Sequence, residues 1–115
     1  MRNILVAMLA LFVLIAVPAE ALDMKTWTKD VMKKVRKEQR YPRSAMNREI
    51  EGQAKVKLTI DAGGNILNSE ITQKTGAAVL DREIPKLVQR LNPLPALPAG
   101  KDSLTFTLPV TWALR

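Results

Sequence analysis

The chain has 115 residues, enough for one small domain, and carries a formal net charge of +7 from 18 Lys and Arg against 11 Asp and Glu. It contains no cysteine and no histidine, so disulfides and thiolate metal sites are excluded, and the commonest general base and transition-metal ligand are missing. We therefore expect neither a metal nor a cofactor, and a basic surface that attracts acidic partners.

The N-terminus is predicted to be a secretion signal. Arg2 precedes an apolar run over residues 4–17, and residues 18–21 read Pro-Ala-Glu-Ala, an A-x-A type cleavage site. The run is shorter than the roughly 20 apolar residues that a membrane-spanning helix needs. We expect residues 1–21 to be a cleaved signal peptide and residues 22–115 to form a single domain in the periplasm. If the signal is retained, the domain is anchored to the inner membrane. Nucleic acid is not an expected partner behind a secretion signal.

An amphipathic helix is predicted from Met24 to Arg40. Apolar residues recur there every three or four positions, at Met24, Trp27, Val31 and Val35, and lysines occupy the remaining faces. Such a helix packs one stripe on a sheet, although a helix lying on a membrane surface has the same pattern. The sequence after it, Tyr-Pro, ends the helix because proline disfavours helical geometry in the residue before it.

Two strands joined by a tight turn come next. Residues 53–60 alternate between polar and apolar side chains, which is typical of a half-buried strand. Residues 61–64, Asp-Ala-Gly-Gly, tolerate a reversal of the chain, so we expect a second antiparallel strand over residues 65–74. Its composition is more polar, which favours a place at the edge of the sheet.

A second helix is predicted from Leu80 to Leu91, with Asp81 as its N-terminal cap. Pro85 is unfavourable inside a helix, so the helix should either bend there or begin near Ile84. Residues 93–100 contain three prolines and are predicted to form a stiff, extended connection.

The last strand has the strongest alternation in the chain. Between Leu104 and Leu114, six apolar side chains share one face and are expected to be buried. Pro109 lies on the other face and lacks an N–H group, which indicates that one side of this strand is not fully paired within the protein's own sheet.

Together these elements predict an α+β fold in which two helices pack on a three-stranded antiparallel sheet, in the order helix, strand, strand, helix, strand. The first strand is expected in the centre, because it pairs with the second through a tight turn and stays available to the third. The last strand is then an exposed edge whose backbone groups can pair with another extended chain.

An enzyme is not expected. Asp61 with Glu70, and Asp81 with Glu83, are the carboxylate pairs that could be considered for acid and base catalysis. The first pair belongs to a turn and its following strand, and the second to the start of a helix, so structural roles account for both.

Four short motifs, in this order, resemble the C-terminal domain of the TonB family, whose members carry inner-membrane energy to outer-membrane transporters. The motifs are Tyr-Pro-Arg-Ser-Ala at residues 41–45, the segment 50–57, Asp61-x-x-Gly64 followed by Gly76, and Leu-Asp at residues 80–81. The resemblance extends from Trp27 to Leu114. It implies a periplasmic binding module associated with TonB-dependent transport.

In that family an N-terminal segment of the transporter adds as a strand beside the last strand of the domain, and the segment around Tyr-Pro also contacts the partner. The resemblance therefore implies the following partner-binding residues: Glu38, Gln39, Tyr41, Arg43, Thr105, Thr107, Pro109 and Thr111. The implied partner is an outer-membrane transporter segment or another envelope protein.

The sequence departs from well-known members of the family, which retain an N-terminal membrane helix bearing a histidine, followed by a long Pro-rich spacer. Neither is recognised here, so we expect a free-standing domain. Two alternatives stay open: a domain for envelope integrity or scaffolding like that of TolA, and a basic module that binds peptidoglycan or lipopolysaccharide. An anionic envelope surface and a strand-swapped homodimer remain further candidates for partners.

Overall fold

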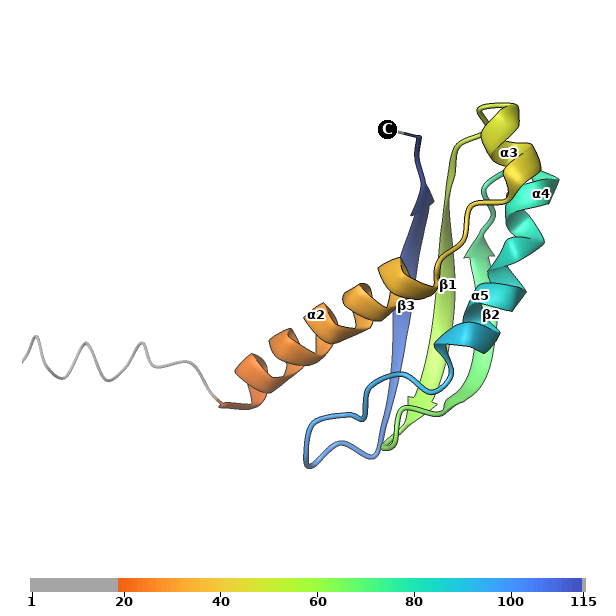
Figure 1. The fold of residues 1–115 in the computed structure, drawn as a ribbon. Helices are drawn as coiled ribbons and strands as arrows, with labels where there is room; N and C mark the ends of the chain where they lie inside the picture. The colour runs from red at the N-terminus through yellow and green to blue at the C-terminus, as the bar shows by residue number, and fades with distance from the viewer. Residues whose placement is uncertain (1–18, 115) are drawn as a thin grey trace, which may run out of the picture.

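Helices and strands follow one another in the predicted order in the computed structural model, which describes residues 19–114 (Figure 1). The predicted signal peptide lies outside these residues except for its end, which begins the first helix. The elements are α2 (Ala19–Glu38), α3 (Arg43–Asn47), β1 (Gly52–Asp61), β2 (Ile66–Gln73), α4 (Ala78–Asp81), α5 (Glu83–Leu91) and β3 (Ser103–Trp112).

The three strands form one antiparallel sheet in the order β2-β1-β3, which confirms the predicted centre and the predicted edge. The β1–β3 ladder is continuous from Gly52 opposite Trp112 to Asp61 opposite Ser103. The β1–β2 ladder instead has a register shift near each end. The sheet is therefore regular on the β3 side and irregular on the β2 side.

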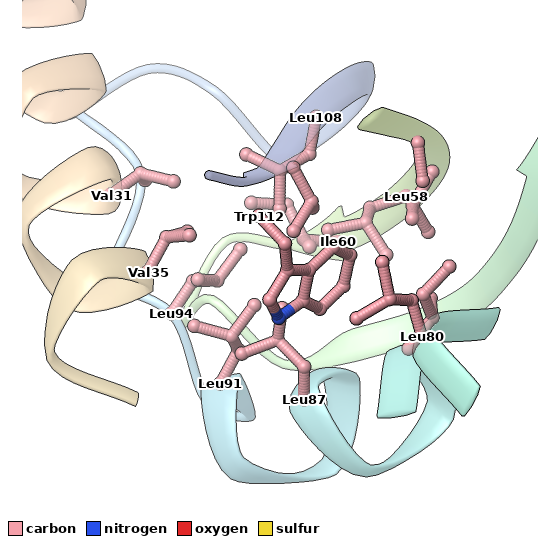
Figure 2. Close-up of a cluster of buried hydrophobic side chains, with 14 of the residues drawn as sticks. Val31, Val35, Leu58, Ile60, Leu80, Leu87, Leu91, Leu94, Leu108 and Trp112 are labelled. Atoms are coloured by element: carbon pink, nitrogen blue, oxygen red, sulfur yellow. The ribbon is translucent and has the colours of Figure 1, made fainter. Parts of the chain in front are cut away.

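The core lies between the sheet and the helices, where α2, α4 and α5 cover one face (Figure 1). The inward side chains of β1, such as Val56 and Leu58, are at most 1% exposed, because alternation places them all on the covered face. Figure 2 shows the Trp112 indole in the middle of this core, beside Leu80 and Leu87 from the helices. Its Nε1 donates a hydrogen bond to the carbonyl oxygen of Arg40 at 2.9 Å.

The turn between β1 and β2 is held by one carboxylate. Asp61 accepts hydrogen bonds from the backbone N–H groups of Gly63 and Asn65, at 3.0 and 2.9 Å, and from the Asn65 side-chain amide. Gly64 has a positive φ of 89°, and a Cβ atom at this position would lie 2.0 Å from the carbonyl oxygen of Leu94. Glycine is therefore needed here both for the backbone conformation and for the close approach of the connection that follows α5.

That connection, residues 92–102, contains no helix or strand, as the prolines predict. It nevertheless packs on the domain, because Leu94 and Leu97 are buried and their N–H groups donate to Gly64 and Ala62. The crossover is thus attached to the β1–β2 turn along its length.

The predicted second helix is divided in two, and the predicted role of Asp81 is wrong. Residues 78–81 already form a helical turn, so Asp81 ends α4 instead of preceding α5, and its Oδ1 accepts hydrogen bonds from the N–H and hydroxyl groups of Thr75. Helix α5 begins at Glu83, so Pro85 lies in its first turn, where a missing N–H costs nothing. The alternative in which the helix begins near Ile84 is therefore the correct one.

The prediction that all six apolar residues of the last strand are buried is also wrong. Leu108, Val110 and Trp112 are buried, but Leu104, Phe106 and Leu114 remain partly exposed. In Figure 1 the first turns of α2 (orange) project beyond β3 (blue) instead of lying flat on the sheet. The first half of β3 is therefore only partly covered by the helix.

Candidate binding edge of the sheet

The free edge of the sheet is formed by β3, which pairs with β1 on one side only. On the other side, the Gln39 side-chain amide donates a hydrogen bond to the carbonyl oxygen of Thr111 at 2.7 Å. Residues two apart in an antiparallel strand direct their backbone groups to the same side, so the carbonyls of Thr107 and Pro109 face this open side too. Pro109, which has no N–H, thus occupies a position where the ladder to β1 requires none.

Two segments far apart in sequence meet at the end of this edge. Gln39 follows α2, and the Trp112 bond to the Arg40 carbonyl holds the same segment against β3. Arg36, Gln39 and Tyr41 line a shallow hollow together with Thr111 and Ala113 of the β3 end. The predicted residues Gln39, Tyr41 and Thr111 are therefore brought together.

Tyr41 has a structural bond of its own, because its hydroxyl donates to the carbonyl oxygen of Ile50. Burial raises the pKa of Tyr41, and the negative charge of Glu51 raises it further. The hydroxyl is therefore protonated and acts as a donor at neutral pH.

Two of the predicted residues lie elsewhere. The backbone carbonyl of Glu38 accepts a hydrogen bond from Arg90 Nε at 3.0 Å, which places Glu38 beside α5. Arg43 is exposed at the start of α3 and does not line the hollow beside Thr111. The threonine side chains of β3 point to the open face of the sheet, where the Thr105 hydroxyl meets that of Thr59 at 3.1 Å.

An apolar groove of about 310 Å³ lies between α2 and the first half of β3. Its walls include Met24, Thr28 and Met32 from the helix and Leu104, Phe106 and Pro109 from the strand. Trp27 lies at the floor of the groove and is held there by two contacts. Its ring packs edge to face on that of Phe106, with 5.3 Å between the ring centroids, and its Nε1 donates a hydrogen bond to the carbonyl oxygen of Pro95 at 2.9 Å. Sequence reasoning missed this groove. The apolar alternation of β3 was the signal for the groove, because it continues along more of the strand than the apolar face of α2 can cover.

Three of the four carboxylates considered for catalysis have structural contacts, and the fourth, Glu70, is exposed on β2. Asp61 holds the turn, Asp81 holds Thr75, and Glu83 forms an ion pair with Arg90 at 2.6 Å. Hydrogen bonds lower the pKa of Asp61, chiefly the one from the Asn65 side chain and then the one from the Asn65 N–H group. Among the described residues, no three potential metal ligands of the His, Cys, Asp and Glu types lie together. None of the helices within residues 19–114 is both long and apolar enough to cross a membrane.

Residues 37–114 match the family described as Gram-negative bacterial TonB protein C-terminal, which is more than half of the chain. The chain belongs to the TonB C-terminal domain family. Over 75 residues it is 28% identical to Protein TonB of Pseudomonas putida, a match that covers 65% of this chain and 31% of that protein. The chain thus spans only about a third of this relative's length.

Solved structures of TonB C-terminal domains have the same fold. The solution structure of the Helicobacter pylori TonB domain superimposes with a TM-score of 0.67 at 20% identity, covering 78% of this chain and 82% of that one. At this identity the likeness shows the fold alone. The C-terminal domain of HasB is 33% identical with a TM-score of 0.54, covering 77% of this chain and 70% of that domain. These comparisons confirm both the predicted family and the predicted α+β fold.

Proposed function

We propose that this TonB-like domain binds an extended segment of an envelope protein, such as the N-terminal segment of an outer-membrane transporter, as a fourth strand on the free edge of β3. The observation that carries the proposal is the Gln39 bond to the Thr111 carbonyl. The Gln39 side chain donates to the Thr111 carbonyl oxygen in the way that the backbone of a neighbouring strand would. The backbone N–H and carbonyl groups of Thr105 and Thr107 face the same open side of β3.

The opposite edge is less suited to the same task. Register shifts near both ends of the β1–β2 ladder disturb β2, and irregular edges resist pairing with another strand. The β3 ladder has no such shift, so its edge offers a regular template.

Backbone pairing alone gives modest affinity. Each hydrogen bond contributes about 0.5–1.5 kcal/mol net, and Pro109 offers an acceptor but no donor. Association also costs several kcal/mol of translational and rotational freedom. Side-chain contacts must therefore supply part of the affinity and most of the selectivity.

The proposed setting is the periplasm, with residues 1–21 removed as a signal peptide and the domain acting in TonB-dependent transport without catalysis. Removal after residue 21 would leave the mature chain beginning within the first turn of α2. Fractionation of cells and the mass of the mature protein test this: an uncleaved chain in the inner-membrane fraction would contradict it.

The binding proposal is tested by titrating the purified protein with synthetic N-terminal peptides of outer-membrane transporters and following backbone amides by NMR. We expect a binding peptide to slow hydrogen exchange at Thr105 and Thr107. Methylating alternate peptide nitrogens on the side facing β3 should abolish binding, whereas methylating those facing solvent should not. If no peptide of the panel protects these amides, the proposal fails.

A second candidate, a basic module that holds to peptidoglycan or lipopolysaccharide, is favoured by the exposed cations of α2, including Lys25, Lys29 and Arg36. Salt distinguishes the two functions, because attraction between exposed charges is screened within about 8 Å at physiological ionic strength. Attachment that disappears between low and physiological salt, without protection of the β3 amides, would support the second candidate instead.

A further inference from the structure

We propose that the outer face of α2 docks on the surface of an anionic phospholipid bilayer through a row of cations, while the helix stays packed on the sheet. The cationic row consists of five exposed side chains: Lys25, Lys29, Lys33, Arg36 and Lys37. It lies on the side of the helix opposite the core, and this contact goes beyond the proposed binding of a strand at β3.

The spacing of the five residues places them on one side of α2. The four lysines, from Lys25 to Lys37, follow one another at intervals of four, and residues four apart are neighbours on the surface of a helix. Arg36 lies in the same arc, because it comes seven residues, or about two turns, after Lys29. At about 1.5 Å per residue, the cationic row is about 18 Å long.

The opposite side of the helix is already occupied by the core. Trp27, Val31 and Val35 are at most 6% exposed, and Trp27 Nε1 donates a hydrogen bond to the carbonyl oxygen of Pro95 at 2.9 Å. An amphipathic helix on a membrane normally buries its apolar face among the lipids. That face is not available in α2, so a bilayer would be met by the cations alone, without insertion of the helix.

The protein's own acids do not neutralise the cationic row. Within residues 19–114, the ion pair of Arg90 with Glu83 involves none of its members. Asp23 and Asp30 of α2 point elsewhere, because they line a hollow with Pro95 of the proline-rich connection. Like charges four residues apart destabilise a helix, so the row opposes folding and attracts an anionic partner.

A bilayer surface fits this arrangement better than a single anion. The cations are carried by long side chains along a convex helix, so a flat surface can meet several of them at once. In Figure 1 the first turns of α2 project beyond the sheet, which leaves this end of the helix uncovered by the rest of the domain. Each Lys or Arg near an anionic lipid surface adds to the attraction, and a row of five is comparable to the basic clusters that hold proteins to such surfaces.

The sequence that leads into the helix also points to a membrane. Residues 4–17 are apolar, and α2 begins at Ala19. Until the predicted signal is removed, this run holds the start of α2 at the inner membrane. Four of the five cations precede residue 37, where the match to the family begins, so the row is a feature of this chain outside the matched segment.

Flotation of the purified protein with vesicles tests the proposal. One set of vesicles is made of phosphatidylcholine, and the other contains about one third phosphatidylglycerol. We expect binding to the anionic vesicles to be at least about tenfold tighter at low salt, and to be largely lost near 1 M salt, where the Debye length is only about 3 Å. Equal binding to both vesicles, or binding that salt does not weaken, would overturn the proposal.

Matched variants separate the cationic row from overall charge. The double change Lys29→Gln and Lys33→Gln should weaken binding to anionic vesicles about 25-fold, because each cation near such a surface contributes about fivefold. Glutamine has a helix propensity close to that of lysine, and urea unfolding checks that the fold is kept. The double change Lys74→Gln and Lys86→Gln removes the same charge at exposed sites outside α2 and should stay within about twofold of the wild type. Equal losses in the two variants would assign binding to net charge, against the proposal.

Quenching by lipids with brominated acyl chains tests whether the helix stays packed. Trp27 and Trp112 are 6% and 1% exposed, so neither indole should be quenched in the bound protein. Strong quenching would show that α2 leaves the sheet and inserts its apolar face, which contradicts docking through the cations.

Other anionic ligands and the β3 edge give distinct results. Adsorption to peptidoglycan or lipopolysaccharide that needs Lys29 and Lys33, without binding to the vesicles, would assign the row to those polymers and overturn the proposal. Lys29 and Lys33 are not among the residues that line the groove or the hollow beside β3. Transporter peptides should therefore protect the Thr105 and Thr107 amides equally in the wild type and in the Lys29→Gln, Lys33→Gln variant, so that strand addition is judged separately from docking on lipid.

Discussion

Single side chains decide which parts of the edge are open to a partner. Gln39 bonds the Thr111 carbonyl as a neighbouring strand would, and it thereby ends the free part of the β3 edge. The bond is exposed, so its net contribution to folding is small, within about 0.5–1.5 kcal/mol. Under the proposed function, its main effect would therefore be on the length of the segment that the edge can pair with.

The change Gln39→Ala should lengthen the usable edge. Peptides long enough to reach Thr111 are expected to bind a few-fold more tightly to this variant, because they gain an acceptor, whereas shorter peptides are unaffected. Calorimetric titration with a long and a short version of one peptide measures the difference, with Gln73→Ala on β2 as the control. Equal weakening of both peptides would show instead that Gln39 contacts the guest directly.

A second residue-scale prediction concerns Asp61, whose pKa is lowered by the hydrogen bonds it accepts in the turn. A carboxylate with a lowered pKa in the folded state stabilises the fold above its unfolded pKa of about 3.9, and this contribution disappears as the pH falls through the folded pKa. The change Asp61→Asn should lower the urea midpoint at pH 7, and the difference should shrink progressively as the pH falls below about 3.9. A difference that persists in acid would contradict the role of the charge.

At the scale of elements, the β1–β2 turn and the proline-rich connection act as one unit. Gly64 lies directly beneath Leu94, and the backbone N–H groups of Leu94 and Leu97 bond to the turn. The contact fixes where the connection crosses the end of the sheet, and therefore where β3 begins.

Two glycines with similar positive φ angles allow this contact to be measured. Gly76 has a φ of 92° with open space around it, whereas a Cβ atom at Gly64 would strike the Leu94 carbonyl. We expect Gly76→Ala to cost about 1 kcal/mol from conformation alone, and Gly64→Ala to cost at least about 2 kcal/mol. Urea unfolding compares the two variants. Similar losses of stability would mean that the proline-rich connection moves away from a Cβ atom at position 64 at little cost.

The sequence predicted the elements in which one buried face imposes a regular spacing of apolar residues. Alternation in β1 and β3 and the turn at Asp61 required only local information, so the strand order and the free edge were predicted correctly. The role of Asp81 was not, because a helical turn precedes it and no strong pattern marks that turn. The groove depends on the angle at which α2 crosses β3, which the helical period of Trp27 and Val31 does not specify.

At the scale of the molecule, the two halves of β3 serve different purposes. The second half, ending in Trp112, completes the core and is buried by the helices (Figure 2). The first half, with Leu104 and Phe106, is left partly open under α2. Under the proposed function, folding and recognition would thus be separated along a single strand.

This separation predicts different effects of two aromatic changes. Trp112→Ala should cost about 3–5 kcal/mol, a large share of the roughly 5–15 kcal/mol that stabilises a domain. Phe106→Ala removes a half-exposed ring and should cost only about 1–2 kcal/mol, while it weakens apolar peptides at the groove. Urea unfolding and peptide titration measure the two effects. Loss of folding in Phe106→Ala would argue against the division.

The sequence contains two tryptophans, and their positions make them built-in fluorescence reporters. Trp112 is enclosed by the core, so its emission should shift to longer wavelength only when the whole domain unfolds. Trp27 stands at the groove in contact with Phe106, so its intensity should respond to an arriving ligand while the fold stays intact. Replacing Trp27 with phenylalanine therefore leaves Trp112 as the sole indole, whose fluorescence reports unfolding of the domain without the response to a ligand.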